Sequence, residues 1–455
     1  MNVPLNLTCT LNTPAIPVTA QPRLVYLLLE VKGTGGPAVL PVNLAIVVDV
    51  SDSMHIRLVT EEQFRQLARR GYLRETLVDG VPAWQSEGIP EEVLASFPRK
   101  IDRVRDALRA AVEQLRPNDR FSLVAFAGRA VTLIPNSPGS EKRRLLGAVE
   151  GLDGLQLGDE TRIGQGMKQG LEELGRGAYP GLAPRMLVLT DGFTLDEKDC
   201  RALARQAVRY RIPISTMGLG GEFNEELMIP IADQTGGEAY LLENPEDIPA
   251  AFARELQRAQ AVQYRNLEVK LRPTPGVEVR AAHRVRPSIA PLETVNEGGS
   301  YSFPLGDLLA GEEMALLVEL IVPPRPAGTY RLAQALVSCD DPAGGMAGLK
   351  ARADVVAEYT ADMARAAQVV PRVMHVVEAV SAYRLQARAQ ADLAAGDVAG
   401  ATRKLRAAAT RLLEMGEAEL AAEMERQAAD LESGRVDPSR TKKLRYETRR
   451  LTQKL

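Results

Sequence analysis

Three oxygen-bearing side chains follow an apolar run near the start of the chain. Residues 42 to 48 are rich in Val, Ile and Leu, which is typical of a strand buried on both faces of a parallel sheet. Asp49, Ser51 and Ser53 lie just beyond its carboxyl end, where open α/β sheets place their ligand sites. One carboxylate and two hydroxyls at alternating positions can converge on one small hard cation. Such an all-oxygen set suits Mg²⁺ better than Zn²⁺.

Two further residues with side-chain oxygens that could bind a metal occur downstream. One stands at the start of a helical pattern and the other at the end of a second apolar strand. The residues concerned are Asp49-x-Ser51-x-Ser53, Thr161 and Asp191-Gly192. Together they resemble the von Willebrand factor A (vWA) domain with its metal-ion-dependent adhesion site. The resemblance covers residues 41–260 and implies a doubly wound, Rossmann-like α/β fold for that part of the chain.

The resemblance also implies how each of these residues would coordinate the metal ion. The hydroxyls of Ser51 and Ser53 would bind Mg²⁺ directly, and Thr161 would bind it directly or through water. Asp49 and Asp191 would act mostly through waters. Mn²⁺ or Ca²⁺ could substitute for Mg²⁺. Neutral hydroxyls and waters leave the ion electrophilic, so it would attract a carboxylate offered by a partner protein.

Two features depart from the family pattern. Asp52 stands where the family usually has glycine, and it adds negative charge beside the expected metal. Residues 55–99 are an insertion, because the helix expected after the Ser-x-Ser loop begins only at about Lys100. Since the insertion leaves and rejoins the chain beside the metal loop, we expect it to border that face. We also expect one of its carboxylates to plug the metal when no partner is bound.

The same five residues have a simpler explanation. Asp, Ser and Thr are preferred as caps and turn residues where strands give way to helices. Three loops at corresponding sheet ends all carry such residues, so a metal site is the favoured interpretation. The turn explanation stays open at this point.

The composition is that of an ordinary globular protein. The formal net charge is −3, which gives no basic bias toward nucleic acid. No apolar run approaches the roughly 18 residues that a membrane helix needs, so we expect no membrane span. The chain has three cysteines, which are far apart in sequence. An odd, scattered set favours free thiols in a reducing compartment over disulfides. We therefore predict a cytoplasmic protein.

Sequence patterns of common enzyme classes are missing. The chain has no P-loop, no nucleophile elbow, no His-Glu-x-x-His and no cysteine pair with metal spacing. We therefore predict that the protein is not an enzyme. The favoured function is a Mg²⁺-dependent protein–protein interaction module, a scaffold or adaptor that binds an acidic residue of its partner. The alternative is a structural, self-assembling protein in which the metal only braces loops.

The rest of the sequence divides into strands and helices. Residues 1–40 and 261–359 contain Val-, Leu-, Thr- and Tyr-rich runs broken by Pro and Gly, which favour strands. Two strands alone are marginal, so we expect them to complete one β-sandwich into which the α/β domain is inserted. Residues 360–435 have helical spacing punctuated by Gly396 and Gly416. This predicts three helices, either a tetratricopeptide-like hairpin or a plain bundle.

Residues 436–455 are rich in lysine and arginine. Such a composition favours a solvated helix face or a disordered basic tail. Thr441, Thr448 and Thr452 lie among these cations. A kinase that prefers basic sites could phosphorylate them, and a phosphothreonine-reading domain could then bind.

Overall fold

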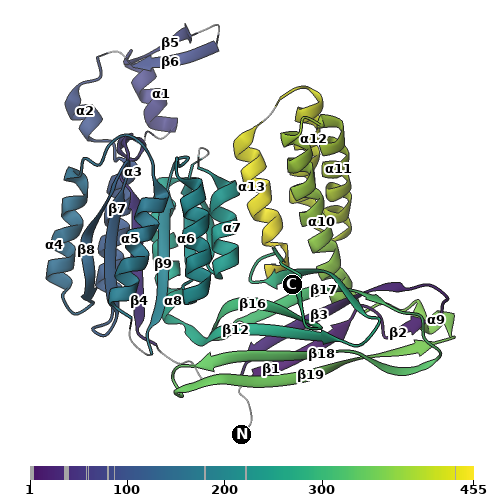
Figure 1. The fold of residues 1–455 in the computed structure, drawn as a ribbon. Helices are drawn as coiled ribbons and strands as arrows, with labels where there is room; N and C mark the ends of the chain where they lie inside the picture. Colours follow the sequence, from purple (N-terminus) through teal and green to yellow (C-terminus); the bar gives the residue numbers. More distant parts are fainter. Residues whose placement is uncertain are drawn as a thin grey trace.

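The computed structural model describes residues 5–34, 40–57, 59, 61–78, 81–86, 88–178, 181–220, 223–435 and 437–454. It contains an α/β domain, a β-sandwich and a helical domain, with the helices standing beside the α/β domain on top of the sandwich (Figure 1). The predicted order of an α/β domain inserted in a β-sandwich and followed by helices is confirmed.

A six-stranded sheet forms the centre of the α/β domain. In spatial order its strands are β11 (Ala239–Leu242), β10 (Ile214–Leu219), β9 (Ala183–Thr190), β4 (Val42–Asp49), β7 (Arg120–Phe126) and β8 (Ala130–Pro138). Neighbours run parallel except for the hairpin of β7 and β8. All eight residues of β4 are buried, which confirms the prediction of a strand covered on both faces.

Helices cover both faces of this sheet because side chains alternate along each strand. On β4, Leu44 and Ile46 pack in one apolar cluster and Ala45 and Val47 in another. One face is covered by α3 (Lys100–Gln114), α4 (Lys142–Glu150) and α8 (Ile248–Gln260). The opposite face is covered by α5 (Ile163–Arg176), α6 (Glu197–Tyr210) and α7 (Glu225–Thr235).

The β-sandwich combines strands from both ends of the chain. Its five-stranded sheet consists of β1 (Leu5–Leu11), β3 (Arg23–Gly33), β17 (Glu313–Val322), β13 (Glu278–Arg286) and β14 (Ala290–Leu292). Its six-stranded sheet consists of β15 (Asn296–Glu297), β16 (Ser300–Leu309), β12 (Val262–Pro273), β18 (Gly328–Asp341), β19 (Met346–Thr360) and β2 (Ala15–Pro17). β3 pairs with β17, and β2 pairs with β19. Strands that precede and follow the inserted domain therefore form one sandwich, as predicted. The short strands β2, β14 and β15 were not predicted.

The helical domain packs on the outer face of the five-stranded sheet. After the short α9 (Met363–Ala366) come α10 (Pro371–Ala394), α11 (Val398–Glu414), α12 (Ala418–Glu432) and α13 (Pro438–Arg449). Leu28 and Leu317 of the sheet share one apolar cluster with α10 to α12. Gly396 and Gly416 have φ of +82° and +83°, so they end α10 and α11 in the left-handed conformation that glycine favours. Within the described residues, no helix combines the length and apolarity that crossing a membrane requires.

The insertion contains α1 (Glu61–Arg69), a hairpin of β5 (Leu73–Val78) and β6 (Val81–Ser86), and α2 (Glu91–Ala95). It projects from the carboxyl end of β4, on the side where the loop with Ser51 and Ser53 lies (Figure 1). This agrees with the expectation from its points of attachment.

Of the two alternatives for residues 436–455, the disordered basic tail is wrong, because most of this segment forms α13 and the short 3₁₀ helix η4 (Leu451–Lys454). Thr448 and Thr452 are buried, and their hydroxyls donate to backbone carbonyls of Leu444 and Val285. A kinase could not reach either hydroxyl without undoing this packing. The proposed phosphorylation of these two threonines is therefore contradicted, and Thr441 is itself half-buried and hydrogen-bonded to Gln427.

A buried ion cluster joins the three domains. The carboxylate of Asp233 on α7 accepts hydrogen bonds from Arg284 of β13 at 2.8 Å and from Arg449 of α13 at 2.6 and 2.9 Å. Both arginine side chains are only 4% exposed. Burial lowers the pKa of Arg449, but the charge of Asp233 and its hydrogen bonds outweigh burial and raise the pKa overall. Arg449, a basic residue of α13, thus has a specific acidic partner in another domain.

We predict that Asp233→Ala destabilises the protein strongly, because it leaves two buried guanidinium groups without a counter-charge. The free energy of unfolding should fall by about 3 to 5 kcal/mol in urea denaturation. Glu243→Ala is the matched control, since it breaks a 2.9 Å ion pair with Lys443, another α13 residue. The side chains of Glu243 and Lys443 are both 52% exposed. That variant should lose less than about 1 kcal/mol. Equal losses in the two variants would contradict the assignment.

A second prediction concerns His283 on β13, which is 6% exposed and whose Nδ1 has no hydrogen-bond partner among the described residues. Burial, and then the charge of Arg384, lower the pKa of His283 from 6.5 to about 4. The unfolded chain takes up this proton at higher pH than the folded protein. The free energy of unfolding should therefore drop as the pH falls from 6.5 to 4, with a contribution at pH 4 of about 3 kcal/mol. His283→Gln should flatten this dependence in urea titrations, and an unchanged slope would refute the prediction.

Candidate functional site

Two loops meet at the carboxyl end of the central sheet because β4 and β9 are adjacent parallel strands. Asp49 accepts hydrogen bonds from the Ser51 backbone N–H at 2.9 Å and from the Thr190 hydroxyl at 2.7 Å. Ser53 donates to Oδ1 of Asp191 at 2.7 Å, and the hydroxyls of Ser51 and Ser53 are 3.1 Å apart. Four of the five predicted residues thus form one hydrogen-bonded cluster.

The fifth residue, Thr161, lies beside this cluster on a third loop. Its backbone carbonyl accepts from the Leu195 N–H at 3.0 Å and from the Thr194 hydroxyl at 3.1 Å. A Cβ placed on Gly192 would lie 3.9 Å from the Thr161 hydroxyl oxygen, so this hydroxyl faces the Asp191-Gly192 turn. In the part of the chain that the structure describes, no hydrogen bond joins this hydroxyl to the other four residues. Thr161 therefore lies beside the cluster without being hydrogen-bonded to it through its hydroxyl.

Glycines on α5 allow the helix to approach the sheet and so position the Thr161 loop. A Cβ on Gly166 would lie 2.7 Å from Cγ1 of Val47 and 2.8 Å from the Phe126 ring. These distances are shorter than a real Cβ can have to such atoms. The closeness of α5 to β4 therefore depends on glycine at this position.

Thr194 and Asp196, which the sequence did not single out, fix the start of α5. The Thr194 hydroxyl accepts from the Ile163 N–H at 2.9 Å, and Asp196 accepts from the N–H groups of Gly164 and Gln165 at 3.1 and 3.2 Å. These are free N–H groups of the first helical turn, which need acceptors from outside the helix. The caps come from a loop about 30 residues away, so no local capping pattern pointed to them.

Lys100, the first residue of α3, is a further member that sequence reasoning missed. Its ammonium lies 2.7 Å from Oδ2 of Asp191, whose side chain is 1% exposed. The acidic residues of the insertion whose side chains the structure describes are Glu62, Glu75, Glu91 and Glu92, and none is bonded to the cluster. Asp79 and Glu87 lie outside the described residues. Among the described groups, a cation rather than the expected carboxylate reaches the site from this side.

The cluster has the electrostatics of a cation site. Burial raises the pKa of Asp49 to about 6, although hydrogen bonds from Ser51 and Thr190 lower it in part. Asp49 is fully buried, whereas Asp52 is exposed and its charge is screened by solvent. A cation beside a desolvated carboxylate favours its charged form.

The residues present fit a hard divalent ion. The donors are hydroxyl and carboxylate oxygens, as Mg²⁺ prefers, and the Lys100 ammonium already acts as a stand-in cation on one of them. Within the described residues, no group of three or more His, Cys, Asp or Glu side chains could hold a metal. An ion here would therefore depend on the hydroxyls of Ser51, Ser53 and Thr161.

Large apolar side chains next to the cluster are exposed to solvent. Phe193 and Leu195, which follow Asp191 on the same loop, are 63% and 65% exposed. Ile56, which follows the Ser53 turn, is 57% exposed. Exposed apolar residues gathered around a polar site are typical of protein interaction surfaces.

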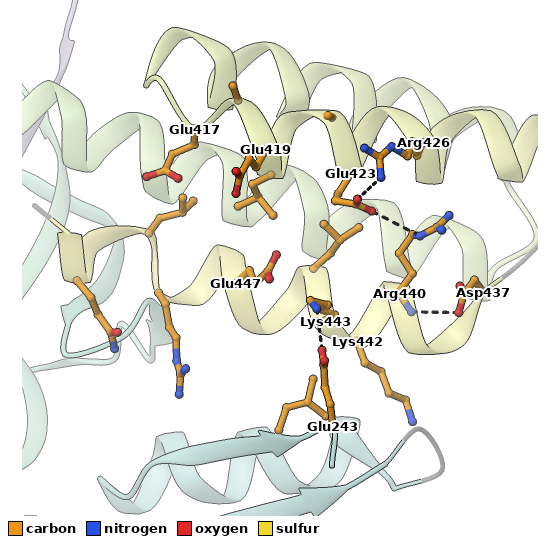
Figure 2. Close-up of a pocket in the computed structure, with 18 of the residues that line it drawn as sticks. Glu243, Glu417, Glu419, Glu423, Arg426, Asp437, Arg440, Lys442, Lys443 and Glu447 are labelled. Carbon is orange, nitrogen blue, oxygen red and sulfur yellow. Dashed lines mark hydrogen bonds and ion pairs between the residues drawn. The ribbon is translucent and has the colours of Figure 1, made fainter. Parts of the chain in front are cut away.

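A cavity of about 1220 Å³ lies between α12 and α13 of the helical domain and the ends of β10 and β11 (Figure 2). Lys442 of α13 lines it and also lies over the rings of Phe193 and Phe223, at 5.9 and 4.9 Å from their centres. Several other charges in the cavity pair with each other, as Lys443 does with Glu243 (Figure 2). The cavity therefore has no strong charge of one sign, but it adjoins the loop that carries Asp191.

Comparisons with known proteins agree with this architecture. A family model described as the von Willebrand factor type A domain matches residues 95–254. A second, described as the Sll0103-like, C-terminal alpha-helical domain, matches residues 371–454. The chain therefore contains a vWA domain followed by a C-terminal helical domain, and the predicted fold class is confirmed. The first match begins near the end of the insertion, so it does not include Asp49, Ser51 and Ser53. The adhesion-site assignment stays a prediction.

Individual proteins are similar to part or all of this chain. The uncharacterized protein sll0103 of Synechocystis sp. is 27% identical over 254 residues, which are 55% of this chain and 60% of the relative. The uncharacterized protein YfbK of Escherichia coli is 23% identical over 240 residues, or 51% of this chain and 40% of the relative. The chain thus spans less than two thirds of these relatives. A von Willebrand factor type A protein from Catenulispora acidiphila has a TM-score of 0.73 at 16% identity, with 98% of this chain and 96% of that chain covered. The ArnB paralog VWA2 from Sulfolobus acidocaldarius has a TM-score of 0.60 at 15% identity, with 99% of both chains covered.

We predict that Gly166→Ala destabilises the fold, because the added methyl group has no room between α5 and β4. The free energy of unfolding should fall by about 1 to 3 kcal/mol. Gly175→Ala on the same helix is the matched control, since a Cβ there meets nothing within 4 Å. That variant should gain up to about 1 kcal/mol, because alanine favours a helix more than glycine does. Equal effects in urea denaturation would show that α5 is not held close at Gly166.

Proposed function

We propose that this protein is a Mg²⁺-dependent interaction module, a scaffold or adaptor that binds an acidic residue of a partner protein. The observation that carries the proposal is the cluster of Asp49, Ser51, Ser53 and Asp191 at the carboxyl end of the sheet, with a cation already on Asp191. Ser51, Ser53 and Thr161 would hold the ion, and Asp49 and Asp191 would orient its waters. When bound, the ion supplies an electrophilic position that a carboxylate can occupy.

The surroundings support a partner with apolar groups beside its acidic residue. Phe193, Leu195 and Ile56 are exposed next to the cluster, and each would lose contact with water when covered. Because Lys442 lies over Phe193, the docking surface extends toward α13 and the cavity beside it. A partner would therefore contact the helical domain as well as the vWA domain.

One observation favours the alternative, in which the protein is structural and the metal only braces loops. Groups of the protein itself already connect the loops, through the hydrogen bonds of Asp49 with Thr190 and of Ser53 with Asp191 and through the ion pair of Lys100 with Asp191. The two functions differ in their metal dependence. A structural protein would self-assemble equally well with Mg²⁺ or a chelator in sedimentation experiments, whereas an interaction module would lose its partner when the ion is removed.

Two other expectations remain predictions. We infer that the protein is not an enzyme, because the chain carries none of the sequence patterns of common enzyme classes. We also infer a cytoplasmic location, which is supported by the free thiols of Cys9, Cys200 and Cys339. Burial raises the pKa of the Cys9 thiol to about 12, so it is unreactive at neutral pH.

The function is tested most cleanly with Thr161→Ala, because the Thr161 hydroxyl makes no hydrogen bond to the cluster that the fold would lose. We expect wild-type protein immobilised in Mg²⁺ to retain a partner that a chelator releases, and the variant to retain none. Mn²⁺ binding by the variant, measured by calorimetry, should weaken at least about tenfold, as expected for loss of a ligand. The melting temperature should change little. Thr410→Ala on α11 is the control and should behave as wild type.

A partner that stays bound to Thr161→Ala in excess chelator would refute the proposal. Asp49→Ala is a poorer test than the sequence alone indicates. Removing this buried carboxylate leaves the Ser51 N–H and the Thr190 hydroxyl without their acceptor, so the fold is weakened as well.

A further inference from the structure

We propose that Lys100 is a built-in cation that competes with the divalent ion for Asp191, so that ion binding requires this side chain to leave. The inference rests on the proposed function, because it concerns the same site. Both oxygens of Asp191 are in use, since Oδ1 accepts from Ser53 and Oδ2 binds the Lys100 ammonium at 2.7 Å. An ion that draws on Asp191 and Ser53 must therefore replace or repel a positive charge.

The position of Lys100 is fixed by the backbone around it. Arg99 caps α3, with its N–H donating to Asp102 at 2.8 Å and its guanidinium bound to Asp102 and to Asp153 at 2.8 and 2.7 Å. The start of α3 is thus tied both to its own first turn and to the turn η2 (Gly151–Gly154). While the insertion stays in place this backbone is held, so the ammonium leaves Asp191 by rotation of its flexible side chain. The Lys100 side chain is 20% exposed, so a path to solvent exists.

The same segment connects the site with the insertion. Residues 57 and 99, at the two ends of the insertion, form a β-bridge, and the Arg57 guanidinium donates to the carbonyl of Phe97 at 3.0 Å. The Lys100 N–H also points to the carbonyl of Ile56, at 3.4 Å. A partner that moves the insertion would shift the first turn of α3, and with it the cation on Asp191. The insertion would then act on the metal site through Lys100 rather than by covering it with a carboxylate.

The competition has a measurable consequence that needs no partner protein. Without the ammonium, the ion no longer has to displace a like charge from its site. We expect Lys100→Met, in the full chain, to bind Mn²⁺ in calorimetry at least about tenfold more tightly than wild type, because a unit charge a few ångströms away is removed. Lys100→Arg keeps the positive charge, so its Mn²⁺ affinity should stay within about threefold of that of the wild type. Lys198→Met removes an exposed lysine of α6 in the same domain and should have no effect.

Thermal unfolding gives an independent readout. Lys100→Met leaves the buried carboxylate of Asp191 without its cation, so the melting temperature should fall in chelator. Added Mg²⁺ should restore it, and the Mg²⁺-induced increase should be larger than in wild type. Lys198→Met should melt as wild type in both conditions.

The outcomes separate this inference from the proposed function. Equal Mn²⁺ affinity of wild type and Lys100→Met, with weakened binding by Thr161→Ala, would overturn the competition and leave the metal site standing. Weaker binding by Lys100→Met would also overturn it, because Lys100 would then support the ion. Absence of saturable Mn²⁺ binding in both proteins would overturn the inference and the proposed function together.

Discussion

The carboxylate of Asp233, in the vWA domain, binds two buried guanidinium groups. One comes from the β-sandwich and the other from the helical domain. Arg284 belongs to the sandwich and Arg449 to the last helix, and both reach α7 of the vWA domain. Buried charges are tolerated only when they are paired in good geometry, so the three domains have little freedom to separate at this point. The vWA domain is therefore presented at a fixed angle, with α13 next to the loop that follows Asp191.

This constraint gives the candidate site a composite border. The vWA domain supplies the oxygen cluster and the exposed side chains of Phe193 and Leu195, and the helical domain supplies Lys442 over Phe193. A vWA domain in isolation would lack the last contribution. In the same way, Lys100 is placed by the insertion and by the cap of α3 rather than by the cluster itself. Two features of this site thus depend on parts of the chain beyond the vWA core: Lys442 belongs to the helical domain, and the backbone of Lys100 is tied to the insertion.

Sequence reasoning located the cluster because its residues follow strands that could be recognised by their apolar runs. The carboxyl ends of adjacent parallel strands necessarily meet, so Asp49 and Asp191 had to be close once β4 and β9 were identified. The helices α10 to α12 and most sandwich strands were predicted for the same reason, since their apolar spacing is local. Asp233 and Arg449 are 216 positions apart, and no local pattern pairs them. The packing of the polar helix α13 against the vWA domain was therefore not predicted.

Long-range pairing also explains what was missed at the site. Thr194 and Asp196 cap a helix that begins about 30 residues earlier, and Lys100 reaches Asp191 across 91 positions. The insertion was expected to bring a carboxylate to the metal, because its acidic residues stood out in sequence. The contact is made instead by a single lysine at its end, whose role depends on the backbone that holds it.

The central claim is that the oxygen cluster at the end of β4 and β9 holds a divalent ion with an open position. Anomalous diffraction from crystals of the full chain grown with Mn²⁺ tests it most directly. The account predicts an anomalous peak bonded to the hydroxyl oxygens of Ser51 and Ser53, with the Lys100 ammonium turned away from Asp191. An empty cluster at saturating Mn²⁺, with Lys100 still bound to Asp191, would contradict it.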